Sequence, residues 1–96
     1  MTIQELLAMC KTSLRITTEA YDEEITGYIQ AALLDLGIAG VAYEAIDDLV
    51  AKAVITYVRF SFGAPDNYDK LKASYDEQKA QLQNSTGYTV WGVSNG

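Results

Sequence analysis

The strongest structural signal in the sequence is the stretch DDLVAKAVITYVRFSFG, residues 47–63. Asp47 or Asp48 can cap the start of a helix, because a carboxylate accepts hydrogen bonds from the free N–H groups of the first turn. Gly63 can end the helix, since glycine adopts the left-handed conformation without steric cost. The sequence therefore predicts a helix over the run from Leu49 to Phe62.

This predicted helix is apolar on nearly every side. Its polar residues are few, and three of them, Lys52, Thr56 and Arg59, fall at i, i+4 and i+7 and form one narrow stripe. A helix with so little polar surface must be covered on most sides. A 96-residue chain builds only a modest core, so we expect other subunits to supply part of the cover.

Two shorter helices are predicted before this stretch. Thr2 and Glu5 have the spacing of a capping box, which predicts the start of the first helix. The second helix is expected to begin near Thr17 or Thr18 and to end before Gly37, with apolar residues at helical spacing between them. Cys10 falls within the apolar stripe of the first helix, so we interpret it as a small core residue.

A fourth helix is predicted from residue 67 to residue 84, after Pro65 has stopped the third. Its apolar stripe is sparse and consists of Tyr68, Leu71, Tyr75 and Leu82. Spacings of three or four residues allow weak ion pairs on this helix; they join Asp66 to Lys70, Asp69 to Lys72 and Asp76 to Lys79. The prediction is a mostly solvated helix with one aromatic seam.

The last residues differ in character from the helices. We divide the chain into a helical domain, residues 1–87, and a C-terminal arm, residues 88–96. Tyr88, Val90 and Trp91 make the arm too apolar for a free tail and give it high β-propensity. Either the arm folds back on its own bundle, or it docks on another chain by strand addition or aromatic anchoring. The predicted fold class is all-α, a small four-helix bundle with an extended C-terminal arm.

Composition argues against several functions. The chain has 13 Asp and Glu against 7 Lys and Arg, a net charge of −6, and no histidine. Without histidine, most metal sites and the usual general base at neutral pH are missing. The acidic balance disfavours the phosphate contacts by which proteins hold duplex DNA. No apolar run approaches the roughly 20 residues of a membrane helix. We therefore expect no enzyme, no cofactor and no membrane contact, but a protein that works by making contacts.

Two acidic clusters leave an alternative open. Asp22, Glu23 and Glu24 form one cluster, and Asp47 and Asp48 form the other. Paired carboxylates can bind a divalent ion or perform acid–base chemistry if they converge in one pocket. Both clusters lie at predicted helix starts, however, where capping and the helix dipole already explain acidic residues. We favour that structural interpretation over a metal-dependent enzyme.

The order of features along the chain resembles a known family. The features are a capped helix that ends KTSLRI (11–16), the segment YDEEI (21–25), the turn DLG (35–37), the apolar helix from residue 47 to residue 63, and PDNYDKLKASYDEQK (65–79). Together they resemble the head–tail connector, or adaptor, proteins of tailed bacteriophages and prophages. The resemblance covers about residues 2–88 and lies in the combined order and length.

The resemblance implies a structural virion protein at the capsid vertex, assembled in the host bacterial cytoplasm. Such proteins form a homo-oligomeric ring of about twelve copies below the phage portal protein. The ring carries the stopper or tail-completion protein, and packaged DNA leaves through its channel without specific binding. On this interpretation, Lys52 and Arg59 form a channel or inter-subunit charge stripe. The expected interface residues are Val54, Tyr57, Val58, Tyr68, Tyr75, Tyr88, Val90 and Trp91.

The principal alternative is a small helical DNA-binding or packaging-associated phage regulator. A helix–turn–helix could lie around Gly37–Gly40. Against it, the helix that would enter the groove has only Lys52 and Arg59 as basic residues and is otherwise too apolar.

Overall fold

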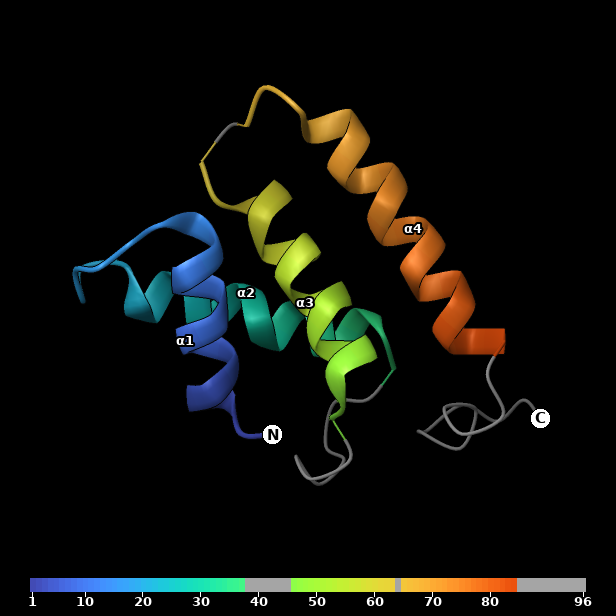
Figure 1. Ribbon diagram of the computed structural model, residues 1–96, viewed down its shortest axis with the longest axis horizontal. Helices are drawn as coiled ribbons and strands as arrows, with labels where there is room; N and C mark the ends of the chain where they lie inside the picture. Colours follow the sequence, from blue (N-terminus) through green and yellow to red (C-terminus); the bar gives the residue numbers. More distant parts are fainter. Residues whose placement is uncertain (38–45, 64, 85–96) are drawn as a thin grey trace.

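The fold is a bundle of four helices, seen in a computed structural model that describes residues 1–37, 46–63 and 65–84 (Figure 1). The helices are α1 (Ile3–Leu14), α2 (Asp22–Asp35), α3 (Asp48–Ser61) and α4 (Tyr68–Asn84). The described residues contain no strand, so the all-α prediction is confirmed. The C-terminal arm, and with it the domain boundary after residue 87, lies outside the described residues.

Two of the predicted helix starts are confirmed by their caps. At α1, the Glu5 N–H donates to the Thr2 hydroxyl at 3.1 Å, and the Thr2 N–H donates to the Glu5 carboxylate at 2.8 Å. This is the reciprocal capping box that the spacing predicts. At α3, the Val50 N–H donates to Asp47 Oδ1 at 3.1 Å, which identifies Asp47 as the cap.

The predicted start of α2 at Thr17 or Thr18 is wrong. The helix is preceded by Tyr21, which makes no side-chain cap, and it begins at Asp22. The chain leaves α1 through Arg15 in the left-handed conformation, at φ 60°. The Thr18 hydroxyl then accepts a hydrogen bond from the Ala20 N–H at 3.2 Å. This local bond gives the backbone an alternative to the helix and delays its start.

The predicted helix ends at two glycines are confirmed. Gly37 follows α2 with φ 80°, and Gly63 follows α3 with φ 70°. A residue with a Cβ is strained in this conformation, so glycine is the residue that ends each helix there without cost.

Helix α3 lies at the centre of the molecule, between α1 and α4 and in front of α2 (Figure 1). Its buried residues are Val50, Ala51, Ala53, Val54, Val58 and Phe60. The protomer itself therefore covers most of α3, but Leu49 remains 54% exposed, and the expectation that other subunits supply part of the cover stays a prediction. Three helices of the same chain contact α3, and α4 packs on it although its own apolar stripe is sparse.

Helix α4 packs on α3 through the predicted seam. Leu71, Tyr75 and Leu82 are buried, whereas Tyr68 at the start of the helix is 44% exposed. Two of the predicted ion pairs take other partners, because Lys72 pairs with Asp76 at 2.9 Å and Lys79 reaches Asp35 of α2.

In the described ranges, none of the helices combines the length and the hydropathy needed to cross a membrane.

Candidate functional site

Aromatic side chains join α3 to α4. The ring of Tyr75 lies edge-on to Tyr57, with centroids 5.3 Å apart, and to Phe60, with centroids 5.6 Å apart. Phe60 also contacts the ring of Tyr68 at 5.6 Å. Tyr75 is only 2% exposed, so the centre of this cluster belongs to the core. Edge-to-face packing adds to the stabilisation that comes from burying the rings.

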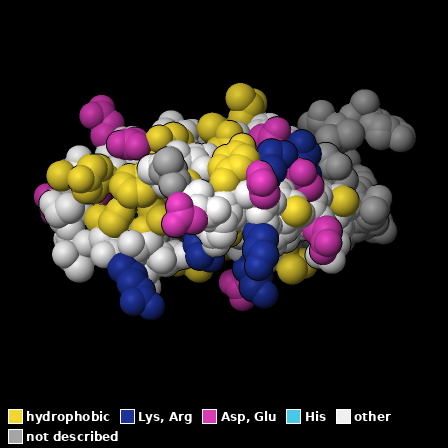
Figure 2. Space-filling model, turned by 90° about the horizontal axis from the view of Figure 1, so that it is seen from above, with side chains coloured by type: hydrophobic (Ala, Val, Ile, Leu, Met, Phe, Trp, Pro, Cys, Tyr) yellow, Lys and Arg dark blue, Asp and Glu magenta, His cyan; other side chains and the backbone are white. Residues whose placement is uncertain are grey.

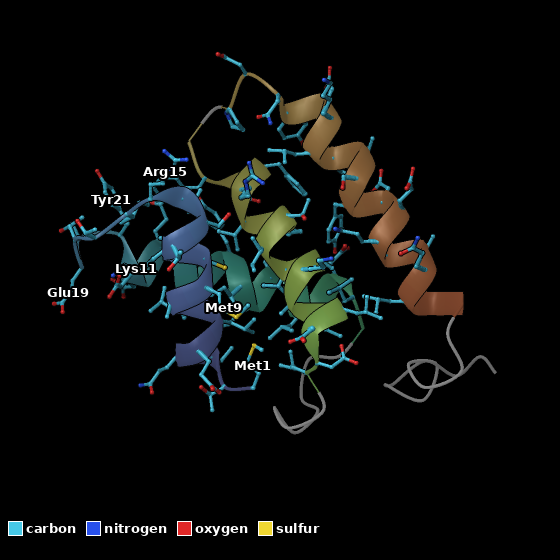
Figure 3. The ribbon with its side chains drawn as sticks, in the orientation of Figure 1. Met1, Met9, Lys11, Arg15, Glu19 and Tyr21 are labelled. Atoms are coloured by element: carbon cyan, nitrogen blue, oxygen red, sulfur yellow. The ribbon has the colours of Figure 1, made fainter. Side chains whose placement is uncertain are left out.

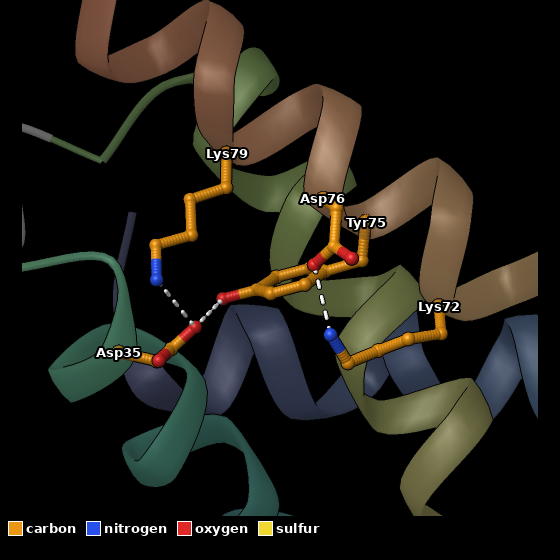
Figure 4. Close-up of polar contacts among 5 residues, drawn as sticks. All are labelled: Asp35, Lys72, Tyr75, Asp76 and Lys79. Carbon is orange, nitrogen blue, oxygen red and sulfur yellow. Dashed lines mark hydrogen bonds and ion pairs between the residues drawn. The ribbon is translucent and has the colours of Figure 1, made fainter.

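A polar contact crosses from α4 to the end of α2 (Figure 4). The Tyr75 hydroxyl donates to Asp35 Oδ2 at 2.5 Å, and Lys79 Nζ lies 3.3 Å from the same oxygen. Partial burial alone would raise the pKa of Asp35, but the hydrogen bonds from Tyr75 and Lys79 outweigh it, so this pKa is lowered. Burial, followed by the bond to Asp35, raises the pKa of Tyr75.

The residues expected at an interface divide into three groups. Val54, Val58 and Tyr75 are buried by the protomer itself, so they belong to its core and not to its surface. Tyr57 is half-buried and Tyr68 is exposed, so both can contact a partner at the edge of the aromatic cluster. The remaining three, Tyr88, Val90 and Trp91, lie outside the described residues.

The charge stripe that the sequence predicts lies on the open side of α3. Lys52 and Arg59 are exposed, and Thr56 between them is half-buried. Within the described part of the chain, neither cation lies at ion-pair distance from a carboxylate. Two apolar residues share this side of the helix, Leu49 at 54% exposure and the half-buried Ile55. We call Leu49, Lys52, Ile55 and Arg59 the outer face of α3.

A shallow groove borders the outer face of α3. It has a volume of about 380 Å³ and runs between α1 and α3. Met9 lies on the side of α1 toward α3 (Figure 3). The lining side chains carry no charge; they are Ala8, Met9, Thr12, Ser13 and Ile55. Figure 2 shows Lys and Arg side chains interspersed with Asp and Glu on this view of the molecule. Ile55 belongs both to the groove and to the outer face of α3, so the groove can accept apolar side chains beside that face.

Helix α2 presents a second exposed surface. Glu23, Gly27, Gln30 and Leu34 recur every three or four residues and are all exposed, so they share the solvent side of the helix. We call these four residues the outer face of α2. Leu34 is 70% exposed, the highest value among the large apolar side chains described. This exposed leucine was not predicted from the sequence. The signal that could have identified it is its position, because Leu34 lies off the apolar stripe that contains Ile29 and Leu33.

Both acidic clusters lie at or beside the first turn of a helix. Asp22 forms an ion pair with Lys11 of α1 at 2.7 Å, and Asp47 caps α3. In residues 1–37, 46–63 and 65–84, no group of three His, Cys, Asp or Glu side chains could hold a metal ion. Cys10 is buried, as the stripe predicts, and burial raises the pKa of its thiol to about 12. A thiol with so high a pKa is a poor nucleophile.

Comparison with known proteins identifies one family. Residues 6–89 match the family described as phage connector protein, and this range includes most of α1 and the whole of the other three helices. No curated protein and no solved structure matches the chain. The match covers most of the 96 residues and agrees with the resemblance drawn from the order of features. The chain belongs to the phage connector protein family.

Proposed function

We propose that this protein is a structural component of the virion, a head–tail connector that forms a ring below the portal. In that position it would join the DNA-filled head to the stopper or tail and give the genome a passage. The observation that carries the proposal is the family match over residues 6–89, because it includes all of α2, α3 and α4 and most of α1.

The surface properties support a role in assembly. The outer faces of α2 and α3 expose Leu34 and Leu49, and the cations Lys52 and Arg59 have no partner within the described residues. Apolar and charged groups left open in this way are suited to protein contacts. The net charge of −6 also suits a passage for DNA, since like charge opposes the phosphate contacts that would hold it.

Electron microscopy of the purified protein mixed with the portal of its own phage tests the proposal. We expect rings bound to the portal, and we expect light scattering to show a complex heavier than portal alone. If only free monomer were found beside unoccupied portal, the proposed function would be wrong.

Removal of residues 88–96 tests the proposed role of the arm in contacts with other chains. We expect the helical bundle to stay folded and its binding to the portal, or to other copies, to weaken. A collapse of the melting temperature would show instead that the arm belongs to the core of its own bundle.

The regulator hypothesis is tested by retention of labelled duplex DNA at low salt. A connector with this charge should not retain the duplex. Tight binding that weakens steeply with added salt would favour a DNA-binding regulator.

A further inference from the structure

The outer faces of α2 and α3 lie on opposite sides of the protomer. Helix α2 runs across behind α3 in Figure 1 and packs on the bundle through buried residues that include Ile25 and Ile29. Its outer face therefore points away from α3. The outer face of α3 points the other way, since α2 covers the back of that helix. A contact between these two faces cannot form within one protomer, but it can form between two copies.

The two faces match in chemistry when the helices run antiparallel. Glu23 begins the outer face of α2, and Arg59 ends the outer face of α3, so opposite charges meet at one end of the contact. Leu34 and Leu49 are both exposed and meet at the other end. Glu23 and Arg59 have no ion-pair partner among the described residues of the protomer. The charges on the two faces are therefore complementary, and their exposed leucines can pack against each other.

The spacing along the two helices matches as well. With a rise of about 1.5 Å per residue, Gly27, Gln30 and Leu34 lie about 6, 10.5 and 16.5 Å from Glu23 along α2. Measured from Arg59, the other three positions of the α3 face, Ile55, Lys52 and Leu49, lie about 6, 10.5 and 15 Å away. In this register Ile55 comes opposite Gly27, and Lys52 comes opposite Gln30.

Gly27 supplies an independent observation. It lies in the interior of α2, where glycine is less favourable than alanine. A Cβ at this position would meet nothing within 4 Å, so the packing of the protomer does not require a glycine. A glycine on an exposed helix face lets another backbone or a bulky side chain approach closely. Opposite the half-buried Ile55 of a second copy, the missing side chain leaves room for the isoleucine.

We propose that copies of this protein associate head to tail, with the outer face of α2 of one copy lying antiparallel on the outer face of α3 of the next. The proposal rests on the proposed function, which requires the copies to assemble. Because the two faces differ, the contact is heterologous, and its repetition closes into a ring if the rotation between copies allows it. The occupant of the α3 face is thus a second copy of the chain.

Charge reversal tests the contact in the full-length protein, alone and with portal. Arg59→Glu and Glu23→Arg should each reduce association at least tenfold in sedimentation velocity, because each places like charges together. Combining them in one chain should restore association, since the pair is then re-formed with its signs exchanged. The matched controls are Lys70→Glu and Glu77→Arg, which make the same charge changes on exposed positions of α4 and should have no effect.

Cross-linking tests the register without changing charge. A chain carrying both Leu34→Cys and Leu49→Cys should form a ladder of covalent oligomers under mild oxidation, while either substitution alone should not. Leu34→Cys combined with Ala73→Cys, on the exposed side of α4, is the control pair and should give no ladder. The native Cys10 is buried in the core and does not interfere.

The outcomes separate this proposal from the proposed function. Restored association in the double reversal, together with the ladder, supports the contact. Rings on the portal that are unaffected by Arg59→Glu and Glu23→Arg would overturn the contact and leave the connector function standing. Absence of any assembly by the wild-type protein, with or without portal, would overturn both.

Discussion

The Tyr75 hydroxyl of α4 donates a hydrogen bond to the Asp35 carboxylate at the end of α2, over 2.5 Å and a separation of 40 positions in the chain. It is the one described side-chain hydrogen bond between neutral and charged groups of different helices, and it ties α4 to an element other than α3. Because the tyrosine ring is buried in the aromatic cluster, the bond fixes the position of α4 along α3 as well as its distance from α2.

Tyr75→Phe should lower the free energy of unfolding by about 1 kcal/mol, since it removes a hydrogen bond to a partly exposed carboxylate and keeps the ring. In a domain of this size that corresponds to a fall of about 4–8 °C in melting temperature, measurable by circular dichroism. The matched control is Tyr28→Phe, which removes a hydroxyl bonded to Glu24 one turn away on the same helix. An equal loss in both variants would contradict a special role for the contact between α2 and α4.

Asp35→Asn should make the free energy of unfolding depend less on pH in the acid range. The pKa of Asp35 is lowered in the folded protein, so its carboxylate stabilises the fold above the unfolded pKa of about 4 and loses this effect as pH falls. Denaturant titrations between about pH 5 and pH 2 should therefore show a smaller loss of stability in the variant than in the wild type. Glu77→Gln, an exposed carboxylate on α4, is the control, and an identical effect there would count against the assignment.

The Cys10 thiol should react slowly with disulfide reagents in the native protein. Its pKa of about 12 leaves almost no thiolate at neutral pH, and the side chain is buried. The reaction rate should rise to that of a free thiol in denaturant, at the same midpoint as the loss of helical signal. Rapid modification of the folded protein would show that α1 opens away from the bundle.

Val54→Asp should unfold the protomer. Val54 is fully buried in the centre of α3, and an unpaired charge there costs several kcal/mol, which is comparable to the whole stability of a small domain. Lys52→Asp is the control, because it introduces the same side chain two residues earlier at an exposed position. A folded Val54→Asp variant with an unchanged melting curve would mean that α3 is not the central helix.

Gly27→Ala should stabilise the isolated protomer by about 0.5–1 kcal/mol, because alanine is the better helix former and its Cβ meets nothing within 4 Å. The same substitution at Gly63 should act in the opposite direction, since the backbone there has φ 70° and a Cβ adds strain. Thermal melts of the two variants at low protein concentration test both signs. A loss of stability at Gly27 would argue that its exposed face has an unseen contact within the protomer.

Local signals in the sequence predict the helix ends well. The capping box at Thr2 and Glu5, the Asp47 cap and the glycines after α2 and α3 each depend on residues a few positions apart. The start of α2 was mispredicted for a local reason too, because the Thr18 hydroxyl can serve a turn as well as a cap.

Contacts between helices could not be predicted from residues a few positions apart in the sequence. The spacing on α4 favours a pair between Asp76 and Lys79, but Lys79 reaches Asp35, 44 positions away, once the two helices are packed. The cover of α3 was underestimated for a similar reason. A sparse seam of large residues such as Tyr75 and Leu82 covers more of a neighbouring helix than a count of apolar positions indicates. The outer face of α2 was not predicted, because the exposure of Leu34 is known only from the structure.

Helix α4 is fastened along one side only. Its extensive contacts are with α3, whereas α1, α2 and α3 all contact one another. The first three helices therefore make a closed unit, and α4 can separate from it by breaking its packing on α3 and the two contacts that Tyr75 and Lys79 make with Asp35. This partial opening should require less free energy than unfolding of the other three helices. Amide protons of α4 should therefore exchange with solvent sooner than those of α3. The protein thus consists of an inner unit of three mutually packed helices and one outer helix that is held mainly by α3.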